Sequence, residues 1–264
     1  MQKLFYLEIG KYYITYLEIP MKILLKLILP LVFLSWSVPA FAFFYGSPVR
    51  TVEDGKMAGG FYYGQTARVI TVDSKYFNAT TVFIYTEKML FGNYGIGKAG
   101  MVQLIYGQTD ITYTGASSAA GTQYGANYRH QLDVPLELGG REVLHGGFAS
   151  YRTGSYSQTM YKGSYNAIEF GYGGDMEVAD KVVVYAAGLY SQLTGTIEST
   201  YTTTAWSGAT LTTTTKTETT KFKSTNNIGV YGGGVYKLDK NISFGGEYHL
   251  IFEAGYALFF QYNL

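Results

Sequence analysis

The most regular feature of this chain is an alternation of apolar and polar residues with a period of two. Between 242 and 250, one face holds Ile242, Phe244, Gly246, Tyr248 and Leu250, and the other holds Ser243, Gly245, Glu247 and His249. Residues 228–238 and 256–264 repeat this arrangement. Successive side chains of a strand point to opposite faces, so strict alternation predicts strands. Helical spacing does not recur after residue 42, and the pattern therefore predicts an all-β fold.

The points at which the alternation starts and stops predict about ten strands. Strands in one direction are expected at 57–67, 100–113, 141–155, 181–198 and 241–252, and returning strands at 80–96, 122–137, 163–176, 222–238 and 255–264. Short turns are expected at Gly97–Gly100, Leu138–Gly140, Val178–Lys181 and Asp239–Asn241, and longer polar connections at 68–79, 114–121, 156–162 and 199–221. Pro135 cannot donate to a strand ladder, so the pair that contains it is the weakest and eight strands are the alternative.

The register of the hairpin formed by residues 228–238 and 242–250 follows from the same pattern. If Asp239–Asn241 is a three-residue turn, Tyr236 faces Phe244 and Gly232 faces Tyr248, which places an aromatic ring over a glycine. Each pair then has both apolar members on one side, as a register with one buried or lipid-facing side requires. Residues 166–176 and 182–193 can be paired in the same way.

Three features favour a transmembrane barrel over a soluble one. The apolar faces carry Tyr and Phe near the strand ends, where aromatic girdles meet lipid headgroups. The opposite faces carry Gly, Ser, Gln, Glu and His, which do not suit a dry core. Short turns alternate with longer connections, as in outer-membrane barrels. We therefore predict an antiparallel up-and-down transmembrane β-barrel of about ten strands. The expected membrane-facing residues are Tyr236, Phe244, Tyr248, Tyr256, Leu258, Phe260, Tyr262 and Leu264.

A targeting segment precedes the alternating region. From Met21 the chain reads MKILLKLILPLVFLSWSVPAFA, with two lysines, an apolar stretch at 27–36 and an A-x-A pattern ending in Ala40 and Ala42. This order predicts a signal peptide at 21–42 that is cleaved after Ala42, since the apolar core is too short to span a bilayer. Residues 1–20 carry acidic residues and are expected to be a mis-assigned extension before the true start, or else a long n-region. The barrel is then 43–264.

The last strand carries a resemblance to a known group of proteins. Its sequence, Tyr-Ala-Leu-Phe-Phe-Gln-Tyr-Asn-Leu at 256–264, resembles the C-terminal signal of bacterial outer-membrane proteins, although those usually end in Phe. Residues 94–102 and 235–248 resemble the periplasmic hairpins of the small outer-membrane barrels, the OmpA-, OmpW- and opacity-like proteins. The resemblance implies the outer membrane of a Gram-negative bacterium, and the even number of expected strands places both termini on the periplasmic side. It implies contact with outer-membrane lipid and lipopolysaccharide, and with the barrel-assembly machinery through the C-terminal strand.

Composition excludes several classes of function. Twenty Lys and Arg against 19 Asp and Glu give a net charge of +1, whereas a nucleic-acid-binding protein normally has a basic surplus. The chain has no Cys, which excludes disulfides and thiolate metal sites. Residues 95–100 match G-x-G-x-x-G, but a strand and not a helix is expected to follow, so this motif is interpreted as a turn.

Candidate chemistry rests on the polar faces of the strands. His130, His145 and His249 match no catalytic triad and are scattered, so we expect no catalytic residue, metal site or cofactor. The polar residues expected to point into the lumen are Lys88, Glu169, Asp175, Lys237, Glu247 and His249. They would form either a salt-bridged plug or a polar path for solutes, and the small size of the barrel favours the plug.

The sequence thus predicts a non-enzymatic integral outer-membrane protein that serves envelope integrity or surface interaction. The Thr-rich segment at 199–221 is expected to be a prominent extracellular hairpin that either binds a surface partner or is merely solvated. A small-solute porin-like channel and a membrane-embedded hydrolase or acyl enzyme are the alternatives.

Overall fold

The computed structural model describes residues 6–9, 12–15, 45–49, 51–73, 78–113, 118–207, 210–251 and 253–264. The chain divides into two compact units, Met1–Pro39 and Ala40–Leu264. In the first unit, the described residues form an antiparallel hairpin of β1 (Tyr6–Ile9) and β2 (Tyr12–Thr15). The predicted signal peptide and its cleavage residues Ala40 and Ala42 lie outside the described residues. No helix in the described ranges is long and apolar enough to cross a membrane.

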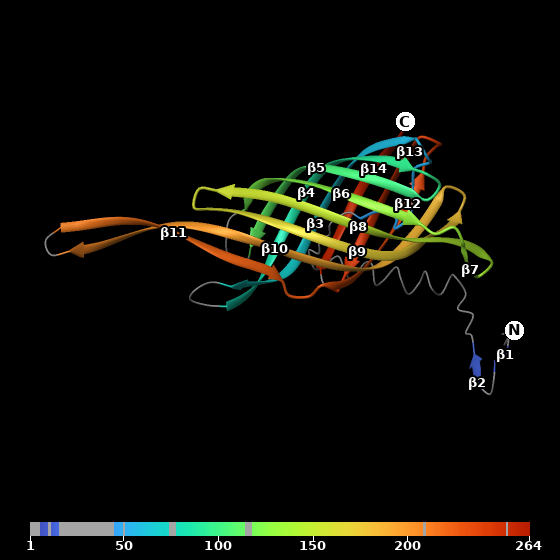
Figure 1. Ribbon diagram of the computed structural model, residues 1–264, viewed down its shortest axis with the longest axis horizontal. Helices are drawn as coiled ribbons and strands as arrows, with labels where there is room; N and C mark the ends of the chain where they lie inside the picture. Colours follow the sequence, from blue (N-terminus) through green and yellow to red (C-terminus); the bar gives the residue numbers. More distant parts are fainter. Residues whose placement is uncertain are drawn as a thin grey trace. The chain divides into compact units, whose positions relative to one another are not determined.

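Among the described residues of the second unit, ten antiparallel strands close into a barrel (Figure 1). In ring order they are β3 (Met57–Asp73), β4 (Asn78–Ile96), β5 (Gly100–Tyr113), β6 (Ala119–Gln131), β8 (Arg141–Gln158), β9 (Tyr161–Ala179), β10 (Val182–Ser207), β12 (Ile228–Lys237), β13 (Ile242–Leu250) and β14 (Glu253–Asn263). Each strand pairs with the next, and β14 pairs with β3 from Glu253 opposite Arg68 to Asn263 opposite Ala58. The predicted ten-stranded antiparallel barrel is confirmed, and the eight-stranded alternative is wrong.

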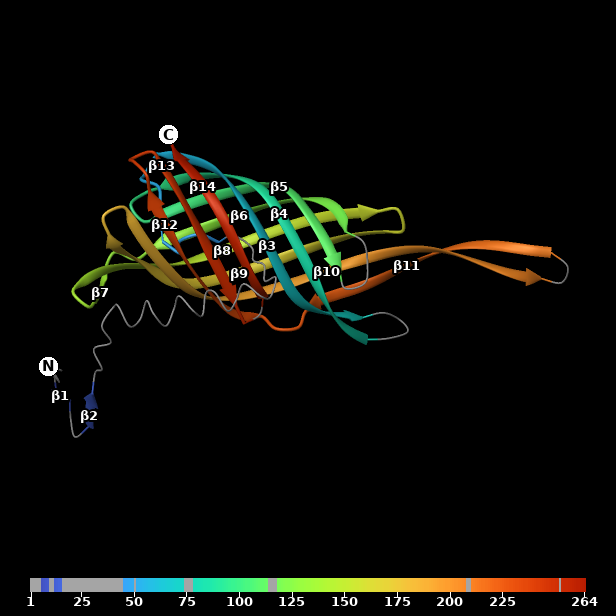
Figure 2. The same cartoon turned by 180° about the vertical axis from the view of Figure 1, so that it is seen from behind.

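The two ends of the barrel differ, and we call them the turn end and the loop end (Figure 2). At the turn end, β8 follows a two-residue turn of Gly139 and Gly140, whose φ angles of 61° and 76° suit a tight hairpin turn and favour glycine. The turn between β12 and β13 is held by Asp239, whose carboxylate accepts the N–H groups of Asn241 at 2.7 Å and Ile242 at 2.8 Å. These two hydrogen bonds hold the pKa of the Asp239 carboxyl below its usual range.

At the loop end, the predicted connection at 199–221 is mostly strand. β10 continues to Ser207 and pairs with β11 (Thr210–Ser224), so the segment forms a two-stranded ribbon that extends beyond the other strands (Figure 1). The expected strand at 222–238 is divided, because β11 ends at Ser224 and β12 begins at Ile228. The last four residues of β11 pair with the end of β3. This pairing continues the barrel wall toward the loop end, beyond the point where the short β13–β14 hairpin stops pairing with β3.

The expected strand at 122–137 is also divided. β6 ends at Gln131, the ladder is interrupted up to Pro135, and a short strand, β7 (Leu136–Leu138), then pairs with the start of β8. Pro135 has no N–H to donate, which explains the interruption. The Leu132 N–H still donates to the His145 carbonyl at 2.9 Å, so the hairpin persists and the strand count stays at ten.

The predicted register between β12 and β13 is correct, because Tyr236 lies opposite Phe244 and Gly232 lies opposite Tyr248. The segments 166–176 and 182–193 also pair, but their register is displaced, since Asn166 lies opposite Thr194 and Met176 opposite Val184. These registers place one alternating face of each strand inside the barrel and the other outside.

Tyrosine rings cover glycines between β8 and β9 inside the barrel. Gly154 lies directly opposite Tyr165, and Tyr156 lies directly opposite Gly163. A Cβ atom at Gly154 would lie 2.6 Å from the ring of Tyr165, and one at Gly163 would lie 2.4 Å from the ring of Tyr156. The missing side chains therefore make room for two buried rings.

Replacing Gly154 by Ala is expected to destabilise the barrel by about 1–3 kcal/mol, because the added methyl group must displace the buried Tyr165 ring. The measurement is the free energy of unfolding in urea with the protein in lipid vesicles. Gly92→Ala is the matched control, since a Cβ there meets nothing within 4 Å. Equal stability of the two variants would contradict the packing role of Gly154.

Candidate functional site

A short segment before the first barrel strand, Tyr45–Val49, lies buried inside the barrel and is called the strap below. The backbone N–H groups of Tyr45 and Gly46 donate to the two carboxylate oxygens of Glu247, at 2.6 and 2.7 Å. The Arg129 guanidinium donates to the Tyr45 carbonyl, and the Ser47 hydroxyl donates to Asp175 at 2.7 Å. Side chains from β6, β9 and β13 thus hold the strap within the lumen.

The Tyr45 side chain occupies the centre of the lumen. Its hydroxyl donates to Glu169 at 2.5 Å, and its ring stacks on His249 with 5.0 Å between the ring centroids. The Arg152 guanidinium lies 5.1 Å from the ring centroid, within the range of a cation–π interaction. Tyr45 therefore joins the polar and aromatic groups of several strands into one packed layer.

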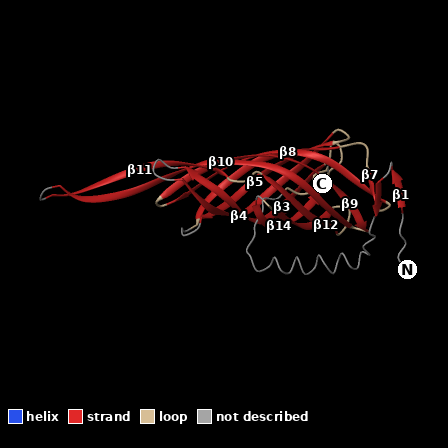
Figure 3. Ribbon diagram, turned by 90° about the horizontal axis from the view of Figure 1, so that it is seen from below, coloured by secondary structure: helices blue, strands red, loops and turns tan. Residues whose placement is uncertain are grey.

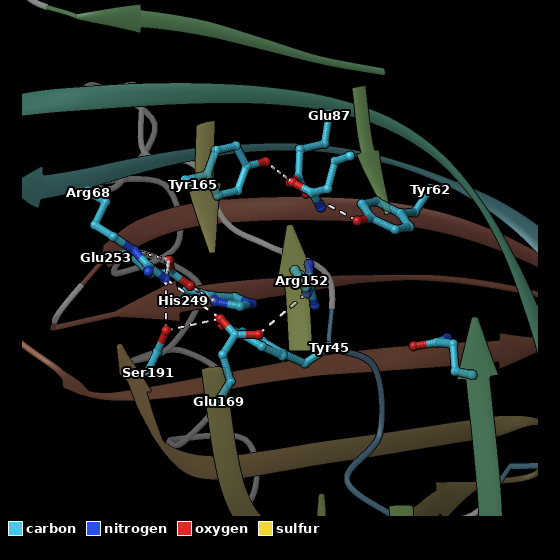
Figure 4. Close-up of polar contacts among 12 residues, drawn as sticks. Tyr45, Tyr62, Arg68, Glu87, Arg152, Tyr165, Glu169, Ser191, His249 and Glu253 are labelled. Carbon is cyan, nitrogen blue, oxygen red and sulfur yellow. Dashed lines mark hydrogen bonds and ion pairs between the residues drawn. The ribbon is translucent and has the colours of Figure 1, made fainter. Parts of the chain in front are cut away.

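Charged side chains around Tyr45 form a buried network (Figure 4). Arg68 on β3 is 2.6 Å from Glu253 and 3.8 Å from Glu169. Arg152 is 3.4 Å from the other oxygen of Glu169. All four side chains are at most 2% exposed. Buried charges are stable only when they are paired and hydrogen-bonded, so each ion depends on its partners.

His249 lies between two carboxylates of this network. Nε2 is 2.7 Å from Glu247 and Nδ1 is 2.9 Å from Glu253. Both ring nitrogens can donate at once only in the imidazolium form. Among the described residues, the ionisable side chains of Arg, His and Glu that are buried to 4% or less are then four basic ones (Arg68, Arg129, Arg152 and His249) and four acidic ones (Glu87, Glu169, Glu247 and Glu253).

Of the residues predicted to point into the lumen, Glu169, Glu247 and His249 lie buried around the strap. Asp175 is half-buried beneath it. Lys237 lies at the exposed rim of the turn end, with its Nζ atom 3.8 Å from Glu177.

The prediction for Lys88 is wrong, because its side chain is exposed on the outer face. The neighbouring Glu87 is the residue that points inward, where it accepts a hydrogen bond from Tyr62 at 3.2 Å. Lys88 lies opposite Tyr63 and Gln108, whose outward-facing polar groups allow a charge at this height.

Sequence reasoning missed Tyr45, Arg68, Arg129, Arg152 and Glu253 as lumen residues. For Arg68 a signal was present, because it continues the inward face of Thr66 and Tyr62 in strict alternation. The strand was expected to end at 67, and the arginine was therefore assigned to a loop.

The three histidines do not come together. His130 is exposed, and its Nδ1 atom lies 3.3 Å from the Tyr128 hydroxyl. His145 lies between the Tyr172 hydroxyl, at 2.5 Å, and the Val134 carbonyl, at 2.6 Å. Across the described ranges, no group of three or more His, Asp or Glu side chains could hold a metal ion.

A cavity of about 620 Å³ opens at the turn end, between the strap and the turn at 239–240. Its lining includes Ser47, Gln103, Arg129, Asp175 and Gln261. Gly46 and Ser47 of the strap also belong to this lining.

The outer face of the barrel is apolar around its whole circumference. Each of the ten strands exposes a large apolar or aromatic side chain, for example Phe61, Leu90, Leu104, Tyr124, Tyr151, Phe170, Tyr190, Val230, Phe244 and Leu258. We call this band the outer belt. Of the predicted membrane-facing residues, Tyr236, Phe244, Leu258, Phe260, Tyr262 and Leu264 are exposed, and Tyr248 and Tyr256 are half-buried.

Comparison with known proteins gives no family and no curated relative, because no family model and no curated protein matches the chain. Solved structures similar to the chain include Ail, the attachment invasion locus protein of Yersinia pestis, at 10% identity over 80% of this chain and 99% of Ail, with a TM-score of 0.30. The translocator domain of the autotransporter NalP from Neisseria meningitidis is similar at 9% identity over 80% of this chain and 89% of that domain, with a TM-score of 0.38.

An outer membrane channel from Pseudomonas putida F1 is similar at 9% identity over 84% of this chain and all of the channel, with a TM-score of 0.34. These proteins are barrels of bacterial outer membranes. At such low identity and TM-score their activities carry no argument for this chain, whose fold and site rest on its own geometry.

Proposed function

We propose that the chain is a non-enzymatic, non-conducting integral protein of a Gram-negative outer membrane, and that it displays a ribbon for surface interaction. The observation that carries this proposal is the distribution of side chains. Large apolar side chains are exposed on every strand of the ring, whereas the interior holds a buried ion-pair network beside its aromatic and aliphatic side chains. An apolar outer face around a whole barrel is favourable against hydrocarbon and unfavourable against water.

The two ends indicate the orientation. Outer-membrane barrels have short turns on the periplasmic side and longer loops outside. The turn end, with the two-residue Gly139–Gly140 turn, is therefore assigned to the periplasm, and the β10–β11 ribbon to the cell surface.

The filled lumen supports a non-conducting state. The strap and the Arg68, Arg152 and Glu169 side chains are buried and bonded to one another across the barrel. A barrel of ten strands is only slightly wider than the eight-stranded size that side chains fill completely. The alternative of a small-solute channel needs a path through this layer.

Planar bilayers containing the full chain are therefore expected to show no single-channel current steps at moderate voltage. A known porin reconstituted in the same lipid is the positive control. Sustained current steps of uniform size would contradict the sealed barrel and would support the small-solute channel instead.

The arrangement around His249 does not favour the enzyme alternative. A hydrolytic triad needs a histidine nitrogen that can take a proton from a nucleophile. Both nitrogens of His249 are instead occupied by carboxylates, and the nearby Ser191 hydroxyl donates to Glu169 at 3.0 Å. Replacing all three histidines is therefore expected to leave lipid and peptide turnover by the purified protein unchanged. A change in turnover would support the membrane-embedded hydrolase or acyl enzyme.

The β10–β11 ribbon is the candidate for surface interaction. Threonines face each other across its two strands, including Thr200 with Thr217, Thr202 with Thr215 and Thr204 with Thr213. β-branched residues favour the extended ribbon, and exposed hydroxyl groups can bond a partner.

Deleting 202–215 and joining the ends with a Gly-Ser turn is expected to leave the barrel intact, because residues 194–199 remain paired with 218–223. Adhesion of expressing cells to epithelial monolayers should fall, while the amount of protein in the outer membrane stays equal. Unchanged adhesion together with increased sensitivity to bile salts would support envelope integrity instead of interaction.

A further inference from the structure

The cavity at the turn end has a wall of amide side chains beside a buried arginine. Asn93, Gln103 and Gln261 line it from β4, β5 and β14, and Arg129 lines it from β6. All four residues are at most 9% exposed. Asn93 and Gln103 lie directly opposite each other in the β4–β5 ladder, so their side chains share the inner face. The volume of about 620 Å³ is within the range of small-molecule sites, roughly 300–1,000 Å³.

Within the described part of the chain, Arg129 is the buried arginine without a carboxylate partner. Arg68 and Arg152, the other buried arginines there, lie 2.6 and 3.4 Å from glutamate oxygens, whereas Arg129 forms no ion pair with a described residue. Its Nη2 atom donates to the Tyr45 carbonyl and to Gln103, at 3.2 Å in the second case. Its Nε atom has no hydrogen-bond partner among these residues. Because a buried charge is stable only when it is paired, Arg129 is suited to bind an anionic group in the cavity.

The amide side chains next to Arg129 keep hydrogen-bonding capacity for a ligand. The Gln103 carbonyl oxygen accepts from Arg129, and its amide N–H groups have no acceptor among the described residues. The Asn93 amide nitrogen donates to Gln261 at 3.2 Å, and its carbonyl oxygen has no donor among them. A donor and an acceptor thus lie on one wall beside a guanidinium, which matches a carboxylate that is followed by a peptide group.

The carboxylates at the opposite, exposed side of the cavity suit a positive group. They come from β8 and β9, and they are Glu142, Asp175 and Glu177. Glu177 lies 3.8 Å from Lys237, whereas Glu142 forms no ion pair with a described residue. Glu142 also lies directly opposite Glu137 in the β7–β8 ladder. Since like charges directly opposite each other destabilise a sheet, a cation beside Glu142 would be stabilising.

We infer that this cavity binds a short peptide of two or three residues with free ends, a function beyond the surface interaction proposed above. The C-terminal carboxylate of the peptide pairs with the Arg129 guanidinium and accepts from Gln103, since hydrogen bonds between two charged groups are the strong ones. A peptide N–H group donates to Asn93, and the N-terminal ammonium group lies beside Glu142. The side chains of the peptide contact the apolar part of the lining, which is Leu144, Val183, Val235 and Phe259.

The lining favours a peptide over a simple anion. Acetate or phosphate would pair with Arg129 but would leave the Asn93 carbonyl oxygen and the Glu142 carboxylate without a partner. A volume of 620 Å³ equals that of a cube with sides of about 8.5 Å, and two or three extended residues span roughly 7–11 Å. Both the chemistry and the size of the cavity therefore fit a dipeptide or tripeptide.

The test is titration calorimetry on the full chain, purified in detergent. The ligands are tri-alanine, tri-alanine amide, N-acetyl-tri-alanine and acetate, so that each charged end of the peptide is removed in turn. Arg129→Gln is compared with Arg141→Gln, because Arg141 is an exposed arginine of the turn end outside the lining. Glu142→Gln is compared with Glu218→Gln, which makes the same charge change on the β10–β11 ribbon.

The native chain is expected to bind tri-alanine about 30-fold more tightly than its amide, because the amide lacks one partner of a buried charge pair. Arg129→Gln should remove this preference for the acid, which a merely structural role of Arg129 would not do. Acetylation of the peptide and Glu142→Gln should each weaken binding by about threefold, since the pair at the exposed side is solvated. Both control variants should change binding less than twofold.

Equal binding of tri-alanine and its amide by the native chain would overturn the inference, as would no binding of either. Acetate that binds as tightly as tri-alanine would mean that the cavity holds a simple anion and not a peptide. A heat-modifiability gel of each variant shows whether its barrel is closed. If Arg129→Gln does not fold, the comparison of the two peptides on the native chain still decides.

Discussion

Replacing Arg68 by Met is expected to destabilise the barrel by about 3–5 kcal/mol. The substitution removes the cation that lies 2.6 Å from Glu253 and 3.8 Å from Glu169, and it leaves both carboxylates buried with less compensation. Breaking one partner of a buried pair costs more than removing the pair, because an uncompensated charge remains. The free energy of unfolding in urea, measured in lipid vesicles, gives the effect.

A double-mutant cycle separates this electrostatic effect from lost packing. Glu253→Gln alone should also destabilise, since it weakens the contacts with Arg68 and His249. The combination Arg68→Met with Glu253→Gln should cost clearly less than the sum of the single changes. Additive costs would mean that the ion pair contributes nothing specific to the lumen.

Replacing Leu258 by Arg is expected to destabilise the barrel in lipid by about 2–4 kcal/mol. Leu258 is 58% exposed on the outer belt, with Phe260 and Tyr256 at the neighbouring outward positions of β14. In water, an exposed Leu→Arg change is nearly neutral, usually within about 0.5 kcal/mol. Hydrocarbon around the belt is the physical reason for the larger cost.

Thr202→Arg is the matched control, because Thr202 is also exposed but lies on the β10–β11 ribbon opposite Thr215, beyond the strands of the ring. Its unfolding free energy should change little in the same vesicles. Equal effects of the two arginines would mean that the outer belt is not in contact with lipid.

Alternation was sufficient to predict the barrel and much of its register. The pairing of Tyr236 with Phe244 follows from the turn at Asp239, since a shift by one residue would move apolar side chains to the polar face. The division of the strand at 122–137 also has its cause in one residue, Pro135. Local sequence determines both features.

The strap could not be predicted in this way. Residues 45–49 have no alternating pattern, and Tyr45 is held by Glu169 and Glu247, which are 124 and 202 positions away in the sequence. Its burial depends on the lumen that the completed ring encloses. A local pattern carries no information about such contacts.

Lys88 illustrates a second limit. The inward face of β4 carries Tyr85, Glu87 and Met89, and the outward face carries Lys88 and Leu90, so polar and apolar residues occur on both. Neither face of this part of the strand is purely polar, and the charge on Lys88 alone does not determine its direction. Tyr63 and Gln108, directly opposite it on the adjacent strands, carry polar groups on the same outer face.

The most direct test of the membrane barrel is a heat-modifiability gel on outer-membrane fractions from cells that express residues 21–264. A closed barrel resists unfolding in detergent until it is boiled, so we expect a band in the outer-membrane fraction that migrates faster unboiled than boiled. A soluble periplasmic protein without a change in mobility would contradict the account, and the alternating strands would then belong to a secreted soluble protein.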